Sequence, residues 1–175
     1  ALLLSQRALD LHAAKRNNID MACSFNHIGT VLLAKGEYES SLEHYRRALE
    51  IFVETVEPHD DRLAETRNNI GTVLYKQSDY ESALEEFQKA LGVFTAGNKE
   101  NSVNPEQARS LTSIGNVYRA QGNPKNALAQ YNRALEILES LTGDQNDATM
   151  ATTFGHIGAL RFDEGEVDEA LECFQ

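Results

Sequence analysis

The 175-residue sequence has only two cysteines, no Asn-x-Ser/Thr sequon and no run of about 18 apolar residues. The lack of a long apolar run excludes a membrane-spanning helix of ordinary length. Cys23 and Cys173 are separated by most of the chain, and two thiols without a disulfide framework are typical of a reducing compartment. We therefore expect a cytoplasmic protein with no membrane partner.

The signatures of catalytic and metal sites are also missing. The five histidines include no pair at the i, i+4 spacing of a helical zinc site. The glycines are spread along the chain and form no loop that could bind a phosphate. We expect no enzymatic activity, no metal ion and no cofactor.

Basic residues are few compared with acidic ones. The 16 lysines and arginines stand against 27 acidic residues, which gives a net charge of −11. A surface of this sign repels both a nucleic-acid backbone and an anionic membrane, so neither is expected as a partner.

The sequence does contain a repeat. The stretch Asn69-Ile70-Gly71-Thr72-Val73-Leu74 recurs in altered form around Gly29, Gly115 and Gly158, and the four repeat glycines are 42, 44 and 43 residues apart. A period in this range indicates an array of structural repeats.

Each repeat contains two segments with helical periodicity. In the second repeat, Leu63, Ile70 and Leu74 fall on one apolar stripe. In the third, Gly122-Asn123-Pro124 supplies in turn a helix stop, an N-cap and a first helical residue. No strand is expected anywhere.

Small residues indicate where the two helices of a repeat are closest. We expect Gly71 at this point, with Ala83 and Ala90 facing it, because small side chains let helix axes approach closely. Phe87 and Tyr45 are expected to fill the space to either side.

The repeat pattern predicts boundaries for the whole chain. The repeats are expected at residues 19–57, 61–97, 104–142 and 147–175, after a truncated repeat of which residues 1–16 are the second helix. We interpret the sequence as a window cut from a longer array. Its ends would expose apolar strips, through which we expect self-association.

This pattern of glycines, alanines and aromatics resembles the tetratricopeptide repeat. The length of the unit, together with Asn68-Asn69 before Ile70-Gly71, resembles the 42-residue kinesin-light-chain type of that family. The resemblance implies an all-α, right-handed α-solenoid of antiparallel helix pairs. It also implies that the first helices line a concave groove that binds peptides or partner proteins.

The resemblance also implies which residues face the groove. Mapped onto this sequence, they are Asn26, Thr30, Asn68, Thr72, Tyr75, Lys76, Arg109, Thr112, Asn116 and Arg119. Side-chain amides both donate and accept hydrogen bonds, so the three asparagines are expected to bind the backbone of an extended peptide. The three basic residues would favour an acidic ligand. The alternative, that these helix positions are basic by chance, stays open.

The sequence thus predicts a non-catalytic scaffold that binds a peptide or partner protein in its concave groove. The alternative is a regulatory or sensor region of a larger signalling ATPase or enzyme. The two hypotheses differ in what flanks the array.

Overall fold

A computed structural model describes the backbone over residues 2–97, 104–141 and 147–173, and the side chains over 17–96, 104–141 and 148–173. Within these ranges the chain forms eight helices and no strand. They are α1 (Leu2–Lys35), α2 (Tyr38–Thr55), α3 (Asp61–Lys76), α4 (Tyr80–Gly97), α5 (Pro105–Ala120), α6 (Pro124–Ser140), α7 (Asp147–Asp163) and α8 (Val167–Cys173). None of them combines the length and apolarity that crossing a bilayer requires.

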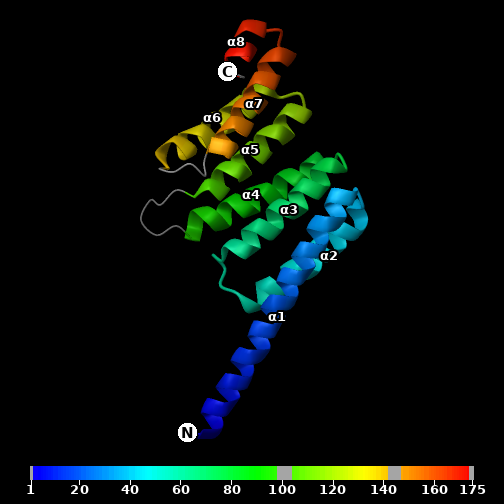
Figure 1. Ribbon diagram of the computed structural model, residues 1–175, viewed down its shortest axis with the longest axis vertical. Coiled ribbons are helices and arrows are strands. Elements are labelled where there is room, and N and C mark those ends of the chain that lie inside the picture. Colours follow the sequence, from blue (N-terminus) through cyan, green and yellow to red (C-terminus); the bar gives the residue numbers. More distant parts are fainter. Residues whose placement is uncertain (1, 98–103, 142–146, 174–175) are drawn as a thin grey trace.

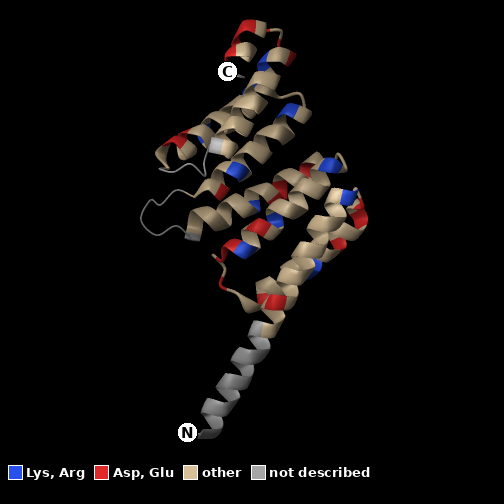
Figure 2. Ribbon diagram, in the orientation of Figure 1, with Lys and Arg blue, Asp and Glu red and all other residues tan. Residues whose placement is uncertain are grey.

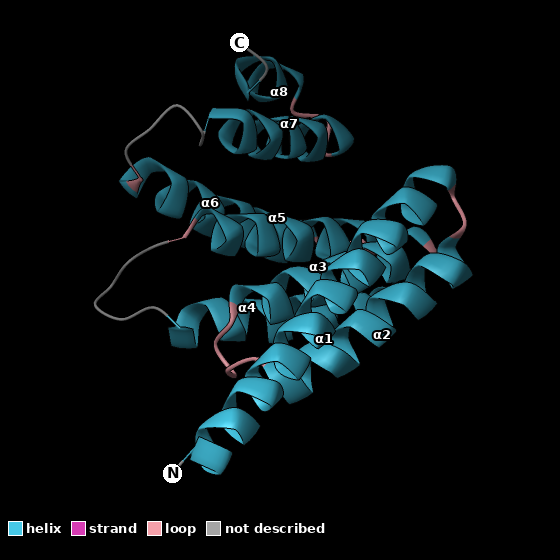
Figure 3. Ribbon diagram, turned by 60° about the horizontal axis from the view of Figure 1, so that its bottom comes forward, coloured by secondary structure: helices cyan, strands magenta, loops and turns pink. Residues whose placement is uncertain are grey.

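The helices form pairs that stack along one axis (Figure 1). α1 packs with α2, α3 with α4, α5 with α6 and α7 with α8, and each pair contacts the next mainly through its second helix. Figure 3 shows the same stacking from another side. The predicted all-α solenoid of helix pairs is confirmed.

The first helix differs from the prediction. The sequence predicts a separate helix over residues 1–16, whereas α1 runs without a break from Leu2 to Lys35. No glycine or proline precedes Gly29, so the stretch lacks the residues that usually stop a helix. The turn expected between residues 16 and 19 is therefore absent, while the repeat boundaries themselves stay a prediction.

The turns inside the repeats follow the local sequence. Gly122 has a φ of +72°, Asn123 Oδ1 accepts a hydrogen bond from the backbone N–H of Asn126 at 3.3 Å, and Pro124 opens α6. These three roles are the predicted ones. In the turn before α4, Ser78 has a φ of 63°, a left-handed conformation that is uncommon for a residue with a side chain.

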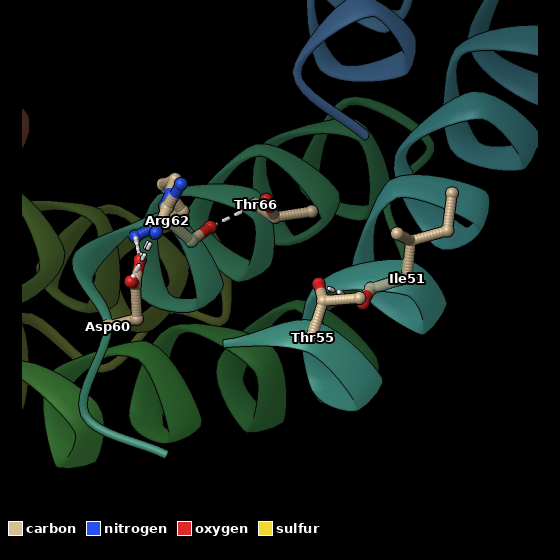
Figure 4. Close-up of polar contacts among 5 residues, drawn as sticks. All are labelled: Ile51, Thr55, Asp60, Arg62 and Thr66. Atoms are coloured by element: carbon tan, nitrogen blue, oxygen red, sulfur yellow. Dashed lines mark hydrogen bonds and ion pairs between the residues drawn. The ribbon is translucent and has the colours of Figure 1, made fainter. Parts of the chain in front are cut away.

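Side chains also fix the connection between α2 and α3 (Figure 4). Thr55 Oγ1 donates to the carbonyl of Ile51 at 2.6 Å. Asp60 caps α3 by accepting from the backbone N–H of Arg62 at 3.0 Å, and its carboxylate accepts from the Arg62 guanidinium at 2.7 and 2.6 Å. The hydrogen bond from this guanidinium lowers the pKa of the Asp60 carboxyl. The chain is thus held in place where it passes from one repeat to the next.

In the first three repeats, an aromatic ring lies directly against the repeat glycine. A Cβ atom added to Gly71 would lie 2.7 Å from Cε1 of Phe87, and one added to Gly29 would lie 2.8 Å from Cδ1 of Tyr45. Gly115 and Tyr131 make the same contact. The sequence predicts the ring to one side of the glycine, whereas the three atoms nearest to the Cβ position of Gly71 are all from Phe87. The ring itself occupies that place, because a glycine leaves room for a flat side chain between the two helices.

Adjacent repeats are joined by a ladder of buried or partly buried hydrogen bonds between their first helices. Asn26 Nδ2 donates to Thr66 Oγ1 at 2.7 Å, and Asn68 Nδ2 donates to Ser110 Oγ at 2.9 Å. Between the last two repeats, Thr112 Oγ1 lies 3.1 Å from Thr153 Oγ1. The first partner always lies three residues before a repeat glycine, and the second lies five residues before the next one. These side chains therefore hold one repeat in register with the next.

The glycine–ring contact makes a prediction about two helical glycines. Gly71→Ala should lower the free energy of unfolding by about 1–3 kcal/mol, because the new methyl group overlaps the Phe87 ring. Gly92→Ala is the matched control, since a Cβ added there meets no atom within 4 Å. That change should raise the free energy of unfolding by up to about 1 kcal/mol through helix propensity. Urea denaturation measures both, and a stabilised Gly71→Ala protein would contradict the contact.

The ladder makes a second prediction. Asn68→Ala should lower the free energy of unfolding by about 1–3 kcal/mol, because Ser110 loses a buried hydrogen-bonding partner. The neighbouring Asn69→Ala removes an amide side chain from a half-buried position outside the ladder. It should lower the free energy of unfolding by less than Asn68→Ala does. Thermal denaturation followed by circular dichroism compares the two. An equal loss in both variants would show that the Asn68–Ser110 bond adds no stability of its own.

Candidate functional site

The first helices of repeats two to four border two adjoining hollows. One, of about 350 Å³, is lined by Thr72, Tyr75, Lys76, Phe87, Ser113, Asn116, Arg119 and His156. The other, of about 310 Å³, is lined by Arg109, Thr112, Ser113, Asn116, Ala148, Thr149, Thr152, Thr153 and His156. Because the hollows share Ser113, Asn116 and His156, they form one depression across α3, α5 and α7. We call this depression the groove.

Seven of the ten predicted groove positions line it: Thr72, Tyr75, Lys76, Arg109, Thr112, Asn116 and Arg119. The other three, Asn26, Thr30 and Asn68, line neither hollow. Asn68 is only 4% exposed, and its amide is taken up by Ser110 in the ladder. Asn26 has the equivalent bond to Thr66, and Thr30 Oγ1 accepts from the Tyr45 hydroxyl at 3.0 Å. The structure places these three side chains in contacts that support the fold.

Asn116 lies at the centre of the groove and is held by its neighbours. Its Oδ1 accepts a hydrogen bond from the Tyr131 hydroxyl at 2.7 Å. Its Nδ2 lies 3.4 Å from Nε2 of His156, and the His156 ring stacks on the Tyr131 ring with centroids 5.9 Å apart. Because Nδ2 is a donor, this arrangement suits a neutral His156 whose Nε2 accepts.

The titration of these two rings fits the same arrangement. Burial lowers the pKa of His156 below its usual 6.5, and the charge of Arg119 lowers it further. Burial raises the pKa of Tyr131, against a smaller opposing effect of Arg119. Near neutral pH, His156 is therefore neutral and Tyr131 keeps the proton that it donates to Asn116.

The basic residues of the groove differ in their partners. Arg119 binds Asp163 Oδ2 through Nε at 2.9 Å and Nη2 at 2.6 Å, and Arg109 Nη2 lies 2.6 Å from Glu106. Lys76 makes no ion pair with any residue that the structure describes. In Figure 2, basic and acidic positions are scattered over the helices among uncharged ones.

Seven lining residues are not among the predicted ones: Phe87, Ser113, Ala148, Thr149, Thr152, Thr153 and His156. Ser113 and His156 share a place two residues before the repeat glycine. That place is one helical turn from the position of Asn116, on the same helix face. The spacing could have identified Ser113 and His156, whereas Phe87 reaches the groove from α4 and carries no such signal.

Comparison with solved structures finds the same fold. The crystal structure of BtubC (BKLC) from P. vanneervenii has a TM-score of 0.75 and 22% sequence identity over 87% of this chain. That of aspartyl phosphate phosphatase F from Bacillus subtilis has a TM-score of 0.75 and 23% identity over 89% of this chain. The chain spans 59% and 39% of these two proteins.

Comparison with sequences gives the family. No curated protein matches the chain. Two models of the tetratricopeptide repeat do match it, one over residues 20–96 and the other over 68–141. Together they cover residues 20–141, which is more than half of the sequence. The chain therefore belongs to the tetratricopeptide-repeat family.

Proposed function

We propose that the chain is a non-catalytic protein-interaction module that binds an acidic peptide or partner segment in the groove across α3, α5 and α7. The observation that carries this proposal is the gathering of Lys76, Arg119 and Asn116 in one hollow of a protein with a net charge of −11. A locally basic hollow on an acidic protein favours negatively charged ligands over positively charged ones.

The groove offers each part of such a ligand a partner. Lys76 has no described ion-pair partner, so a ligand carboxylate can bind it without breaking an existing contact. Arg119 already binds Asp163, and a second carboxylate would share its guanidinium. Tyr75 and Phe87 supply apolar surface beside these charges. The expected ligand is thus an acidic side chain next to an apolar one.

Three finer assignments belong to the same proposal. The repeat period of 42 to 44 residues supports the kinesin-light-chain type of unit. The free thiols of Cys23 and Cys173 support a cytoplasmic location. The alternative role, a regulatory region of a larger signalling ATPase or enzyme, is supported by the similar fold in aspartyl phosphate phosphatase F, of which this chain spans 39%.

The proposal predicts the effect of removing groove charges. Lys76→Ala and Arg119→Ala should each weaken the acidic peptides selected from a peptide array by about tenfold, or roughly 1.4 kcal/mol. The loss should shrink as salt is added, since exposed charges are screened. Lys125→Ala is the matched control, because it removes the same charge from an exposed position of α6 outside the groove. Isothermal titration calorimetry at two salt concentrations measures all three. If both groove variants bound the peptides as tightly as the parent protein, the ligand would bind another surface of the protein.

The neutral state of His156 predicts a dependence on pH. Its lowered pKa means that it gains a charge only below its usual 6.5. A bound carboxylate would favour that charge, so affinity for an acidic peptide should rise as the pH falls from 7 towards about 5, by up to about tenfold. His156→Gln should abolish the rise, and His59→Gln, at an exposed site outside the groove, should keep it. Circular dichroism at each pH ensures that folded protein is compared. A rise that persists in His156→Gln would exclude this histidine as its source.

A further inference from the structure

The ion pair between Arg119 and Asp163 joins two repeats beside the groove. Arg119 is the last residue but one of α5, and Asp163 is the last residue of α7. These two helices contact each other. Both hydrogen bonds of the pair, from Nε at 2.9 Å and from Nη2 at 2.6 Å, end on Oδ2 of Asp163. Arg119 lines the first hollow, whereas Asp163 lines neither hollow. Asp163 thus neutralises a cation of the groove from outside the groove.

The charges of the first hollow can be counted from its lining. Its two permanently charged side chains are Lys76 and Arg119. Arg119 is paired with Asp163, while Lys76 makes no ion pair within the described part of the chain. His156 adds no charge near pH 7, because burial and the charge of Arg119 lower its pKa. The hollow therefore contains one positive charge that no residue of the chain compensates.

The repeat explains why one cation is paired and the other is free. Arg119 and Asp163 lie four and five residues after the glycines of their own repeats. The same two places in the first and second repeats hold Leu33 and Lys76. A leucine cannot neutralise an ammonium group. The free charge of Lys76 and the paired charge of Arg119 thus follow from the residue that each neighbouring repeat supplies.

The ion pair is not needed to hold the two repeats together. The side chains of Arg119 and Asp163 are 33% and 54% exposed, and ion pairs in contact with water contribute little to stability. The buried contact between Thr112 and Thr153 already joins the same two helices. The main effect of Asp163 is therefore on the charge of Arg119.

We propose that Asp163 determines how many negative charges the groove accepts: it neutralises Arg119 and leaves Lys76 as the one free cation, so that a second acidic residue beside the first adds no affinity. The inference rests on the proposed binding of acidic segments in this groove and specifies their charge. The preferred partner is a segment with one acidic side chain next to an apolar one.

The geometry of the pair shows why a second ligand carboxylate would gain so little. Nη1 of Arg119 donates to no residue that the structure describes, so one edge of the guanidinium is open to a ligand. A carboxylate that bound there would share the guanidinium with Asp163, and the two negative charges would repel each other. Attraction by Arg119 and repulsion by Asp163 then oppose each other, whereas Lys76 attracts the first carboxylate without opposition.

The test measures the binding of three forms of one peptide to the 175-residue chain. The peptide is an acidic one selected from the peptide array, with both ends blocked. At one place its forms carry two adjacent glutamates, one glutamate beside a glutamine, or two glutamines. Isothermal titration calorimetry at low salt gives the three affinities. The quantity of interest is the ratio of the affinities for two glutamates and for one, since a loss of folded protein affects both alike.

The ratio should depend on Asp163. In the unaltered protein, the first glutamate should raise the affinity by about tenfold and the second should change it by less than about threefold. In Asp163→Asn, the second glutamate should raise the affinity by about tenfold, because Arg119 is no longer neutralised.

Glu164→Gln is the matched control, since it removes the same charge from the next residue, which is not bonded to Arg119. This variant should keep the ratio of the unaltered protein. An unchanged ratio in Asp163→Asn, or an equal rise in Glu164→Gln, would overturn the proposal.

A double variant shows whether Asp163 acts through Arg119. In a protein that already carries Arg119→Ala, the further change Asp163→Asn should leave the ratio unaltered, because the cation that it would free is gone. A ratio that still rose would show a different route and exclude the proposed one.

The same measurements separate this inference from the proposed function. If the unaltered protein bound the two-glutamine form as tightly as the one-glutamate form, the groove would not select acidic segments, and both would be wrong. If the first glutamate raised the affinity but Asp163→Asn left the ratio unchanged, only the role of Asp163 would be wrong.

Discussion

The contact between a glycine of the first helix and an aromatic ring of the second is the constraint on which the first three repeats depend. The ring occupies the space that a Cβ atom would need, as Phe87 does at Gly71 and Tyr45 at Gly29. This contact sets how close the two helices lie and how they are turned about their axes. It also determines which residues of the first helix face the neighbouring repeat and which face the groove. The ladder and the groove both follow from that orientation.

Side chains of the first helices have two roles: some bind the neighbouring repeat, and others line the groove. Residues three positions before the repeat glycine, such as Asn68, form the bonds that hold successive repeats together. Residues on the other side of the glycine, such as Asn116 and Arg119, remain accessible in the groove. Asn116 connects the groove to the packing of the repeat. The hydroxyl of Tyr131, whose ring packs on Gly115, donates a hydrogen bond to Asn116 Oδ1. The packing of the repeat therefore orients the central polar group of the groove.

Most of the fold could be predicted because its determinants are local. The helix pairs follow from periodicity, and the turn at Gly122-Asn123-Pro124 follows from residue types in a fixed order. The role of Asn68 could not be predicted in this way, since its burial depends on a side chain that lies 42 residues away. The continuity of α1 escaped prediction for a different reason. Residues 2–16 have the pattern of a second helix, but pattern alone does not indicate whether the chain turns after them.

The glycine and the ring are 16 residues apart in each of the three repeats where the contact is described, whereas the repeat period varies between 42 and 44. Variation in length thus lies outside the segment between the glycine and the ring. During the duplication and divergence of such genes, residues can be gained or lost between units without disturbing the core of any unit. The number and composition of the units can therefore change while the way in which each one folds is inherited intact.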